Sequence, residues 1–251
     1  LTGVNIGDFG NGTNESFLGL IKELDKIENI DRYRISSIEP DLLSPEIIEF
    51  VSKSKKFVPH FHIPLQSGSD LLLKKMRRRY GTSLYRERID LIKGIMPDAC
   101  IGVDVIIGFP GETEAEFNKT ISFINELPVS YLHVFTYSER NNTTAVRMED
   151  IVPVNLRRVR SKQLRILSEK KKRAFYNSQI NKKEQVLFEK NEDDGNMFGF
   201  TSNYIKVKAP YNPLIINQTA MVKMTELNND GTMKINYADQ RQESKFLAEV
   251  I

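Results

Sequence analysis

The stretch Cys100-Ile101-Gly102-Val103-Asp104-Val105-Ile106-Ile107, followed by Gly108-Phe109-Pro110-Gly111-Glu112-Thr113, decides the fold of this 251-residue chain. Its first eight residues are almost all apolar, which is typical of a strand buried in a sheet. Glycines and a proline then turn the chain, and Thr113 followed by Glu116 has the spacing of a capping box. A buried strand that leads through a turn into a helix is the unit of a parallel α/β sheet.

The same alternation of strand and helix continues on both sides of this stretch. We expect strands at about residues 1–6, 33–38, 61–65, 101–107 and 132–137. Apolar residues between them recur at helical spacing, and Ser44-Pro45 is typical of a helix start. Five such units predict a parallel sheet of TIM-like barrel type, but five are too few to close an eight-stranded barrel. We therefore expect a partial barrel whose beginning is truncated.

A change of pattern after Asn181 predicts a second domain. Short strands are expected at residues 185–189, 199–200, 203–209, 219–224 and 232–237, separated by Asp-Gly, Asn-Pro and Asn-Asp-Gly turns. This spacing favours a small all-β barrel of five strands. The expected domains are residues 1–182 and 183–251.

A long basic helix is expected between the two patterns, over residues 153–180. It carries one acid, Glu169, and its positive charges indicate either a solvated face or a nucleic-acid contact. The basic residues are Arg157, Arg158, Arg160, Lys162, Arg165, Lys170, Lys171, Lys172 and Arg173.

Composition limits the class of protein. No stretch reaches the roughly 20 apolar residues that a membrane helix needs, and the start has no secretion signal, so we expect a cytoplasmic protein. We also expect a monomer. The formal charge of +3 does not by itself indicate nucleic acid. The single cysteine, Cys100, excludes a cluster held by several cysteines of this chain and is interpreted as a small core residue.

Polar residues follow each expected strand, where a parallel sheet binds its ligands. Two patterns within them could carry chemistry unaided. His60 and His62 share a strand face, as the ligands of a metal pair would, but no third ligand stands at a metal-site spacing, which favours packing in the barrel. Glu39 and Asp104 could act as acid and base, although no spacing ties them together.

At these loops the sequence resembles a known family, the radical S-adenosylmethionine methylthiotransferases. The matching segments are residues 34–40 (Arg-Ile-Ser-Ser-Ile-Glu-Pro), 62–70 (His-Ile-Pro-Leu-Gln-Ser-Gly-Ser-Asp), 76–80 (Met-Arg-Arg-Arg-Tyr), 102–113 and 132–140. The first and third resemble the branch that acts on N6-threonylcarbamoyladenosine beside the tRNA anticodon. The C-terminal part resembles the RNA-binding barrel called TRAM. One departure is Asn142, where the family usually has glycine, and asparagine tolerates the left-handed backbone expected there.

The resemblance implies an enzyme that adds a methylthio group at C2 of the modified adenosine by radical chemistry. The intact enzyme would use S-adenosylmethionine and two [4Fe-4S] clusters, with tRNA as its partner. Neither set of cluster cysteines occurs in this chain, so we expect a fragment, inactive by itself, of a partial radical SAM barrel followed by a TRAM barrel.

The resemblance and the strand ends together give candidate residues. Contacts with S-adenosylmethionine are expected from Asn5, Gln66, Ser67 and Asp104, while Ser36 and Glu39 would serve the cofactor or the adenosine. RNA contacts are expected from Arg140, Tyr204, Lys206 and Lys208. In the segment 204–209 the alternation of a strand would turn Tyr204 and both lysines outward and Ile205, Val207 and Ala209 inward.

Two other functions stay open at this point. A non-catalytic RNA-binding protein could have a degenerate barrel of this kind. An aldolase-like barrel enzyme would need no cysteines, but it would need a Schiff-base lysine at a strand end, and the strand ends offer none.

Overall fold

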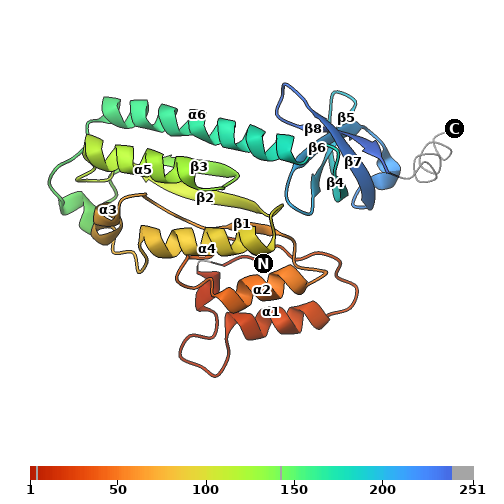
Figure 1. Ribbon diagram of the computed structural model, residues 1–251, viewed down its shortest axis with the longest axis horizontal. Coiled ribbons are helices and arrows are strands. Elements are labelled where there is room, and N and C mark those ends of the chain that lie inside the picture. The colour runs from red at the N-terminus through yellow and green to blue at the C-terminus, as the bar shows by residue number, and fades with distance from the viewer. Residues whose placement is uncertain (4, 142, 239–251) are drawn as a thin grey trace. The chain divides into compact units, whose positions relative to one another are not determined.

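The computed structural model describes residues 1–3, 5–141 and 143–238 (Figure 1). They form two compact units: the first is Leu1–Lys171, and the second begins at Lys172. The predicted domain boundary at residue 182 lies 11 residues further along the chain than this division (182 − 171). Asn142, where the sequence departs from the family pattern, lies outside the described residues.

A parallel sheet forms the centre of the first unit. It consists of β1 (His60–His62), β2 (Cys100–Ile107) and β3 (Tyr131–Thr136), in that order. The register pairs Gly102 with Tyr131 and Asp104 with His133. These are three of the five predicted strands.

The other two predicted strands, at residues 1–6 and 33–38, are wrong as regular strands. Tyr33 and Ser37 form only isolated parallel bridges, to Phe57 and His62, and residues 6–8 form the 3-10 helix η1. The backbone of Leu1 still accepts a hydrogen bond from Ser36 at 3.1 Å. The two segments therefore lie in chain order beside β1, but their ladders are too sparse for strands.

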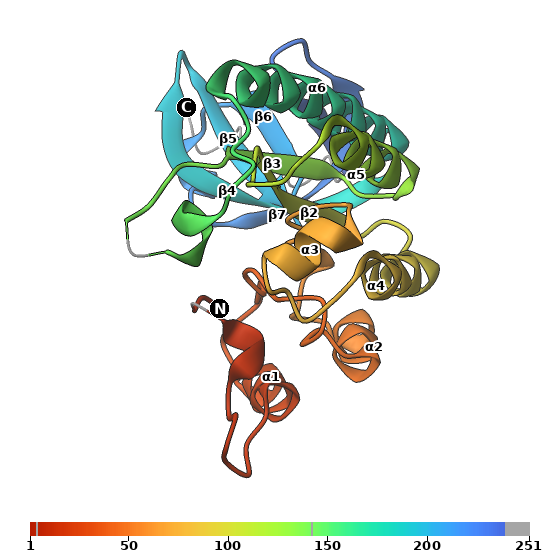
Figure 2. The same ribbon diagram turned by 90° about the vertical axis from the view of Figure 1, so that its left-hand side faces the viewer.

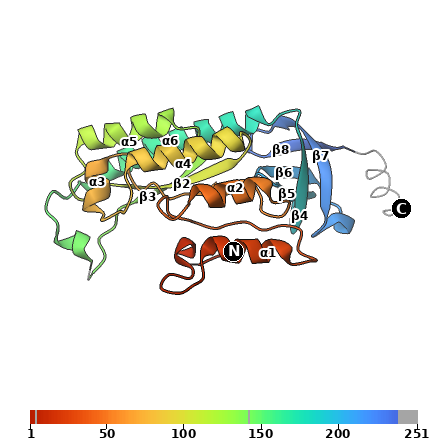
Figure 3. The same ribbon diagram turned by 60° about the horizontal axis from the view of Figure 1, so that its bottom comes forward.

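Helices cover one face of this sheet, with α4 and α5 side by side over it (Figures 2 and 3). The helices of this unit are α1 (Phe17–Lys26), α2 (Pro45–Lys53), α3 (Asp70–Lys75), α4 (Thr82–Ile95), α5 (Glu114–Glu126) and the start of α6 (Val154–Ser178), with a short 3-10 helix η2 (Thr144–Arg147). The predicted caps are present in part: Thr113 accepts from the backbone N–H of Glu116, and Pro45 is the first residue of α2.

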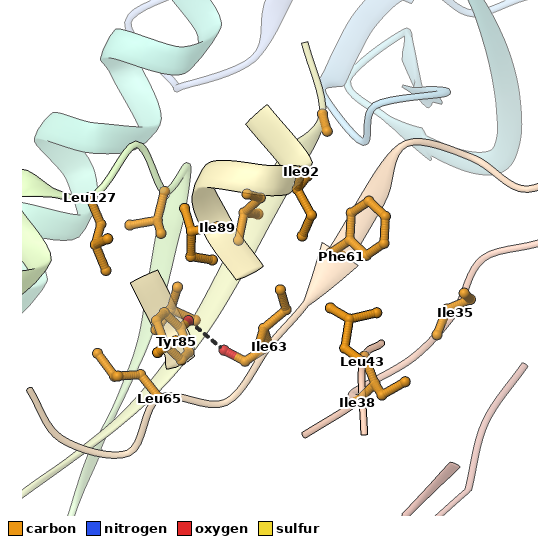
Figure 4. Packing of buried hydrophobic residues seen from close by; sticks show 14 of the residues in the cluster. Ile35, Ile38, Leu43, Phe61, Ile63, Leu65, Tyr85, Ile89, Ile92 and Leu127 are labelled. Carbon is orange, nitrogen blue, oxygen red and sulfur yellow. Dashed lines mark hydrogen bonds between the residues drawn. The ribbon is translucent and has the colours of Figure 1, made fainter. Parts of the chain in front are cut away.

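Alternate residues of β2 point into the core beneath the helices. Val103, Val105 and Ile107 are buried there among apolar residues of α4 and α5. The buried Tyr85 of α4 donates its hydroxyl to the carbonyl of Ile63 at 2.8 Å, which ties the helix to the sheet (Figure 4). Because side chains alternate along a strand, Gly102, Asp104 and Ile106 point to the opposite face.

The second unit is the closed five-stranded barrel that the sequence predicts. Its strands are β4 (Lys183–Asp193), β5 (Asn196–Thr201), β6 (Lys206–Pro210), β7 (Thr219–Leu227) and β8 (Met233–Tyr237), with the 3-10 helix η3 (Pro213–Ile215). They close in the order β4-β5-β6-β8-β7. Closure pairs every strand on both sides, so the barrel has no open edge.

Candidate functional site

The face of the sheet away from the helices gathers all three histidines of the chain. His60 and His62 of β1 lie on this face with Gly102 and Asp104 of β2 and with Tyr131 and His133 of β3. Gly102 is required here, because a Cβ atom at this position would overlap the ring of Tyr131. The strand pattern therefore places a polar layer where a barrel binds its ligand.

His62, Asp104 and His133 form a cluster in this layer. Their ligand atoms lie within 4.8 Å of one another, and the Nε2 atom of His62 lies 2.8 Å from a carboxylate oxygen of Asp104. The third metal ligand that the spacing lacked is thus supplied by the fold. The rings of His62 and His133 are stacked, however, with 5.3 Å between centroids and 21° between planes. A metal ion lies in the plane of the imidazole that binds it, so these rings would have to turn to share one.

His60 takes no part in that cluster. Its Nε2 atom lies 3.1 Å from the hydroxyl of Tyr131, and its side chain is buried. Burial, with a smaller contribution from the nearby charge of Arg34, lowers the pKa of His60 to about 3. Burial and His62 also lower the pKa of His133. His60 and His133 are therefore neutral near pH 7, and the burial of His60 agrees with the prediction that it packs in the barrel.

Gln66 brings the chain back across the end of this sheet. Its backbone has a φ of 66°, a left-handed conformation that is uncommon for a residue with a side chain. Its N–H donates to the carbonyl of Asp104 at 2.8 Å, and its carbonyl accepts from Ile106 at 2.9 Å. These two bonds hold Gln66 beside Asp104.

A pocket of about 450 Å³ opens at this end of the sheet, which is within the usual size of a small-molecule site. Five residues of its wall are apolar or aromatic, and the rest include several hydrogen-bond donors. Its lining consists of Gln66, Arg78, Asp104, Ile106, Phe109, Phe135, Thr136, Tyr137, Ser138, Arg140, Thr143 and Ala145. The fold therefore brings together Gln66, Asp104 and Arg140, which the sequence proposed separately.

Two buried polar atoms of the pocket residues have no hydrogen-bond partner among the described residues: the Nε atom of Arg78 and the hydroxyl of Tyr137. Arg78 is held from its other side, where Nη1 donates to Glu39 at 2.6 Å. The ring of Tyr137 packs edge-on against Phe109. Buried polar groups in native proteins are nearly always satisfied, so such orphaned donors point to a ligand.

The other predicted cofactor residues lie outside the pocket lining. Ser67 is buried beside α5, where its hydroxyl lies 3.2 Å from that of Thr120. Asn5 is exposed and its amide donates to Asp8. The hydroxyl of Ser36 is buried and has no partner among the described residues. Glu39 reaches the pocket only through Arg78.

Two arginines of the basic helix α6 are structural. Arg160 donates to Glu112 at 2.8 Å and to Glu114 at 3.0 Å, and Arg157 donates to Glu139 at 2.6 Å. Both arginines are buried. A Cβ atom at Gly108, where φ is 79°, would overlap Arg157, so the turn after β2 needs glycine. The charge run is thus neither wholly solvated nor wholly available to RNA.

The second unit carries an outward face that mixes aromatic rings with lysines. Ile205, Val207 and Ala209 are buried as predicted. Tyr204 precedes β6 in a left-handed turn and stacks on Phe200, with centroids 4.6 Å apart. The β5–β6 register places Phe200 opposite Lys206 and Phe198 opposite Lys208.

Contacts across these strands tie the rings to the lysines. The Nζ atom of Lys206 lies 4.2 Å from the centre of the Phe198 ring, and Lys208 forms an ion pair with Asp230 at 3.4 Å. We call Phe198, Phe200, Tyr204, Lys206 and Lys208 the aromatic-basic face. The two phenylalanines were missed because the sequence pattern shows alternation within a strand but no register between strands.

Comparison with known proteins now shows what the first unit is similar to. Residues 8–124 match the model of the radical SAM superfamily. The first unit is thus similar to a radical SAM domain. Coproporphyrinogen III oxidase from Escherichia coli, described as a radical SAM enzyme, shares its fold with a TM-score of 0.53 at 12% identity, over 83% of this chain and 51% of that one.

Curated relatives confirm the resemblance to tRNA methylthiotransferases. The threonylcarbamoyladenosine tRNA methylthiotransferase MtaB of Bacillus subtilis is 40% identical over 82% of this chain and 47% of its own length, and that of Thermotoga maritima is 34% identical over 93% and 53%. The tRNA-2-methylthio-N(6)-dimethylallyladenosine synthase of Pelotomaculum thermopropionicum is 34% identical over 81% and 46%. The chain spans about half the length of the curated relatives it matches.

The radical SAM domain implies an iron-sulfur cluster and S-adenosylmethionine. Several thiolates hold such clusters, and the one cysteine here, Cys100, is buried, which raises its pKa to about 12. The residues of this chain do not fit a cluster. The pocket does fit an adenosyl group, since Ile106, Phe109 and Phe135 offer an apolar wall beside the polar Gln66 and Asp104.

In the part of the chain that the structure describes, none of the helices combines the length and the apolar character needed to cross a membrane.

Proposed function

We propose that the protein to which this chain belongs is a tRNA methylthiotransferase acting on N6-threonylcarbamoyladenosine, and that it adds the methylthio group at C2 of the adenine. The observation that carries the proposal is a nucleoside-sized pocket at the end of a radical SAM sheet, in a chain that continues into a closed barrel with an aromatic-basic face. The names of the relatives at 34–40% identity support the reaction and the modified base.

S-adenosylmethionine, bound at a cluster, supplies the radical chemistry in this proposal. Two [4Fe-4S] clusters would belong to parts of the protein outside these 251 residues, so this chain by itself would be inactive. Gln66 and Asp104 would orient the adenosyl group from the pocket floor. His62 would position Asp104 through the 2.8 Å contact, keeping its carboxylate turned toward the pocket.

The tRNA would be held in part by the aromatic-basic face of the second unit. Lysines beside half-buried aromatic rings suit a nucleic-acid strand, because phosphates pair with the lysines while bases stack on the rings. Phe198, Phe200 and Tyr204 offer three rings in this arrangement, and the β5–β6 register sets the two lysines beside them. Arg140, at the pocket, would contact the RNA near the modified nucleoside.

Nucleoside mass spectrometry of tRNA from a strain that lacks the gene tests the proposal. The methylthio mark on threonylcarbamoyladenosine should disappear and return on complementation, while the mark on dimethylallyladenosine should stay. Loss of only the dimethylallyl mark would assign the protein to the other group of relatives. Retention of both marks would refute the reaction.

A further inference from the structure

Donors without partners surround one side of the pocket. Arg78 donates from Nη1 to Glu39, so the edge of its guanidinium formed by Nε and Nη2 is left for another acceptor. The Nε atom is buried and has no partner among the described residues. The buried Tyr137 hydroxyl also has none. Arg140 lines the same pocket and, among the described residues, forms no ion pair. These side chains require a ligand rich in acceptors.

Charge balance narrows the chemistry of that ligand. Glu39, which lies outside the pocket lining, offsets the charge of Arg78, and Asp104 is the acid that lines the pocket, held by His62. The charges of these four side chains therefore balance, but Arg140 forms no ion pair with a described residue. A ligand whose single anionic group pairs with this guanidinium therefore suits the site. The planar edge of a guanidinium matches a carboxylate with two parallel hydrogen bonds, which a single phenol or amide cannot provide.

From this geometry we infer that Arg78, Tyr137 and Arg140 form a carboxylate subsite that reads the threonyl carboxylate of the modified base. The inference rests on the proposed function and names the residues that determine its substrate specificity. The donors take the N6 substituent of the modified adenine, while the apolar wall of Ile106, Phe109 and Phe135 serves the adenosyl group of the cofactor. A dimethylallyl substituent has no acceptor and would leave the buried donor atoms of Arg78 and Tyr137 unpaired, which costs binding free energy.

Binding of free nucleosides to this chain tests the subsite directly. The probes are N6-threonylcarbamoyladenosine, its carboxyl methyl ester and N6-dimethylallyladenosine, measured by calorimetry or equilibrium dialysis. The free acid should bind about tenfold or more tightly than the ester, because a hydrogen-bonded charge is lost on esterification. The dimethylallyl nucleoside should bind no better than the ester.

Three variants and a control locate the effect. Arg140→Gln should bring the ratio of acid to ester affinity close to one, and Arg78→Gln should do the same unless the loss of its Glu39 contact unfolds the loop. Tyr137→Phe is the variant that should not disturb the fold, because the Tyr137 hydroxyl has no partner among the described residues. In this variant the affinity for the free acid should fall about two- to tenfold. Arg147→Gln, an exposed arginine outside the pocket lining, should leave the ratio unchanged.

The outcomes separate this subsite from the proposed function. Equal affinity for acid and ester, or no binding of the acid at millimolar concentration, would refute the subsite even if the deletion strain loses the threonylcarbamoyl mark. If S-adenosylmethionine, and not the nucleoside, loses affinity in the variants, the donors serve the carboxylate of the cofactor and the inference is wrong. Tightest binding of the dimethylallyl nucleoside, insensitive to the variants, would overturn both.

Discussion

Arg160 and Glu112 form an ion pair in which the two side chains are 3% and 1% exposed and the charged atoms lie 2.8 Å apart. The same carboxylate accepts the backbone N–H of Gly108 at 3.1 Å, so the pair joins α6 to the turn after β2. Burial raises the pKa of Glu112, while the hydrogen bonds from Arg160 and Gly108 oppose the rise. Such a pair constrains the fold, because removal of either partner leaves the other charge buried and uncompensated.

Removal of one partner should therefore destabilise the first unit strongly. Arg160→Met leaves the Glu112 carboxylate buried without its cation, and we expect a loss of about 3–5 kcal/mol in the free energy of unfolding. Denaturant titration followed by circular dichroism measures it. The exposed Arg158→Met on the same helix is the matched control and should stay within about 0.5 kcal/mol. Equal stabilities for the two variants would contradict the assignment.

His60 should make stability depend on pH. Its pKa is about 3 in the folded chain and about 6.5 when unfolded, so between these values the unfolded state binds more protons. The stability that neutral His60 contributes is present above pH 6.5 and is lost as the pH falls, by about 1.4 kcal/mol per pH unit. His60→Gln keeps a polar group near Tyr131 without the titration. Its unfolding free energy, measured at a series of pH values, should have a shallower slope; an identical slope would mean that other groups are responsible.

Iron binding by this polypeptide should be negligible. Cys100 is buried and its pKa is raised to about 12, so it offers no accessible thiolate to a cluster. Iron and sulfide analysis after anaerobic reconstitution checks this. Four irons per chain would contradict it, and Cys100→Ser should give the same low iron content as the unchanged chain.

The aromatic-basic face should govern the salt dependence of tRNA binding. The double variant Lys206→Ala, Lys208→Ala should weaken binding and reduce the salt slope by about 0.7–0.9 log units per lost phosphate contact. Lys183 and Lys223, which lie opposite each other on β4 and β7 of the same barrel, provide the matched control pair. If the control pair changes the slope and Lys206 and Lys208 do not, the RNA binds elsewhere on the barrel.

The sequence predicts this fold best where local pattern and burial agree. The apolar run of β2 and the alternation around Val207 gave a strand and a barrel wall because each is decided by neighbouring residues. In residues 33–38 the apolar Tyr33, Ile35 and Ile38 stand among polar residues, and the segment forms only isolated bridges, since a ladder also needs a partner strand in register. Register cannot be read from one segment.

Candidate-site residues show the same limit. Gln66 and Asp104 were found because they follow strands, and the carboxyl ends of parallel strands meet. Arg78 and Tyr137 were named within the family segments and given no role, since only the folded pocket shows that their donors are buried without partners among the described residues. Arg157 and Arg160 were read as part of a charge run, and burial made them structural.

Arg157 has a consequence for how the pocket wall can vary. Its guanidinium donates to the carbonyl of Tyr137 at 2.9 Å and to that of Val152 at 2.7 Å, so one side chain holds together the two ends of the loop that separates β3 from α6. The entropic cost of closing a flexible loop rises only slowly with the length of the loop, by about 0.6 kcal/mol for each doubling. Insertions within this loop should therefore reshape the wall that carries Arg140 while the sheet beneath keeps its stability.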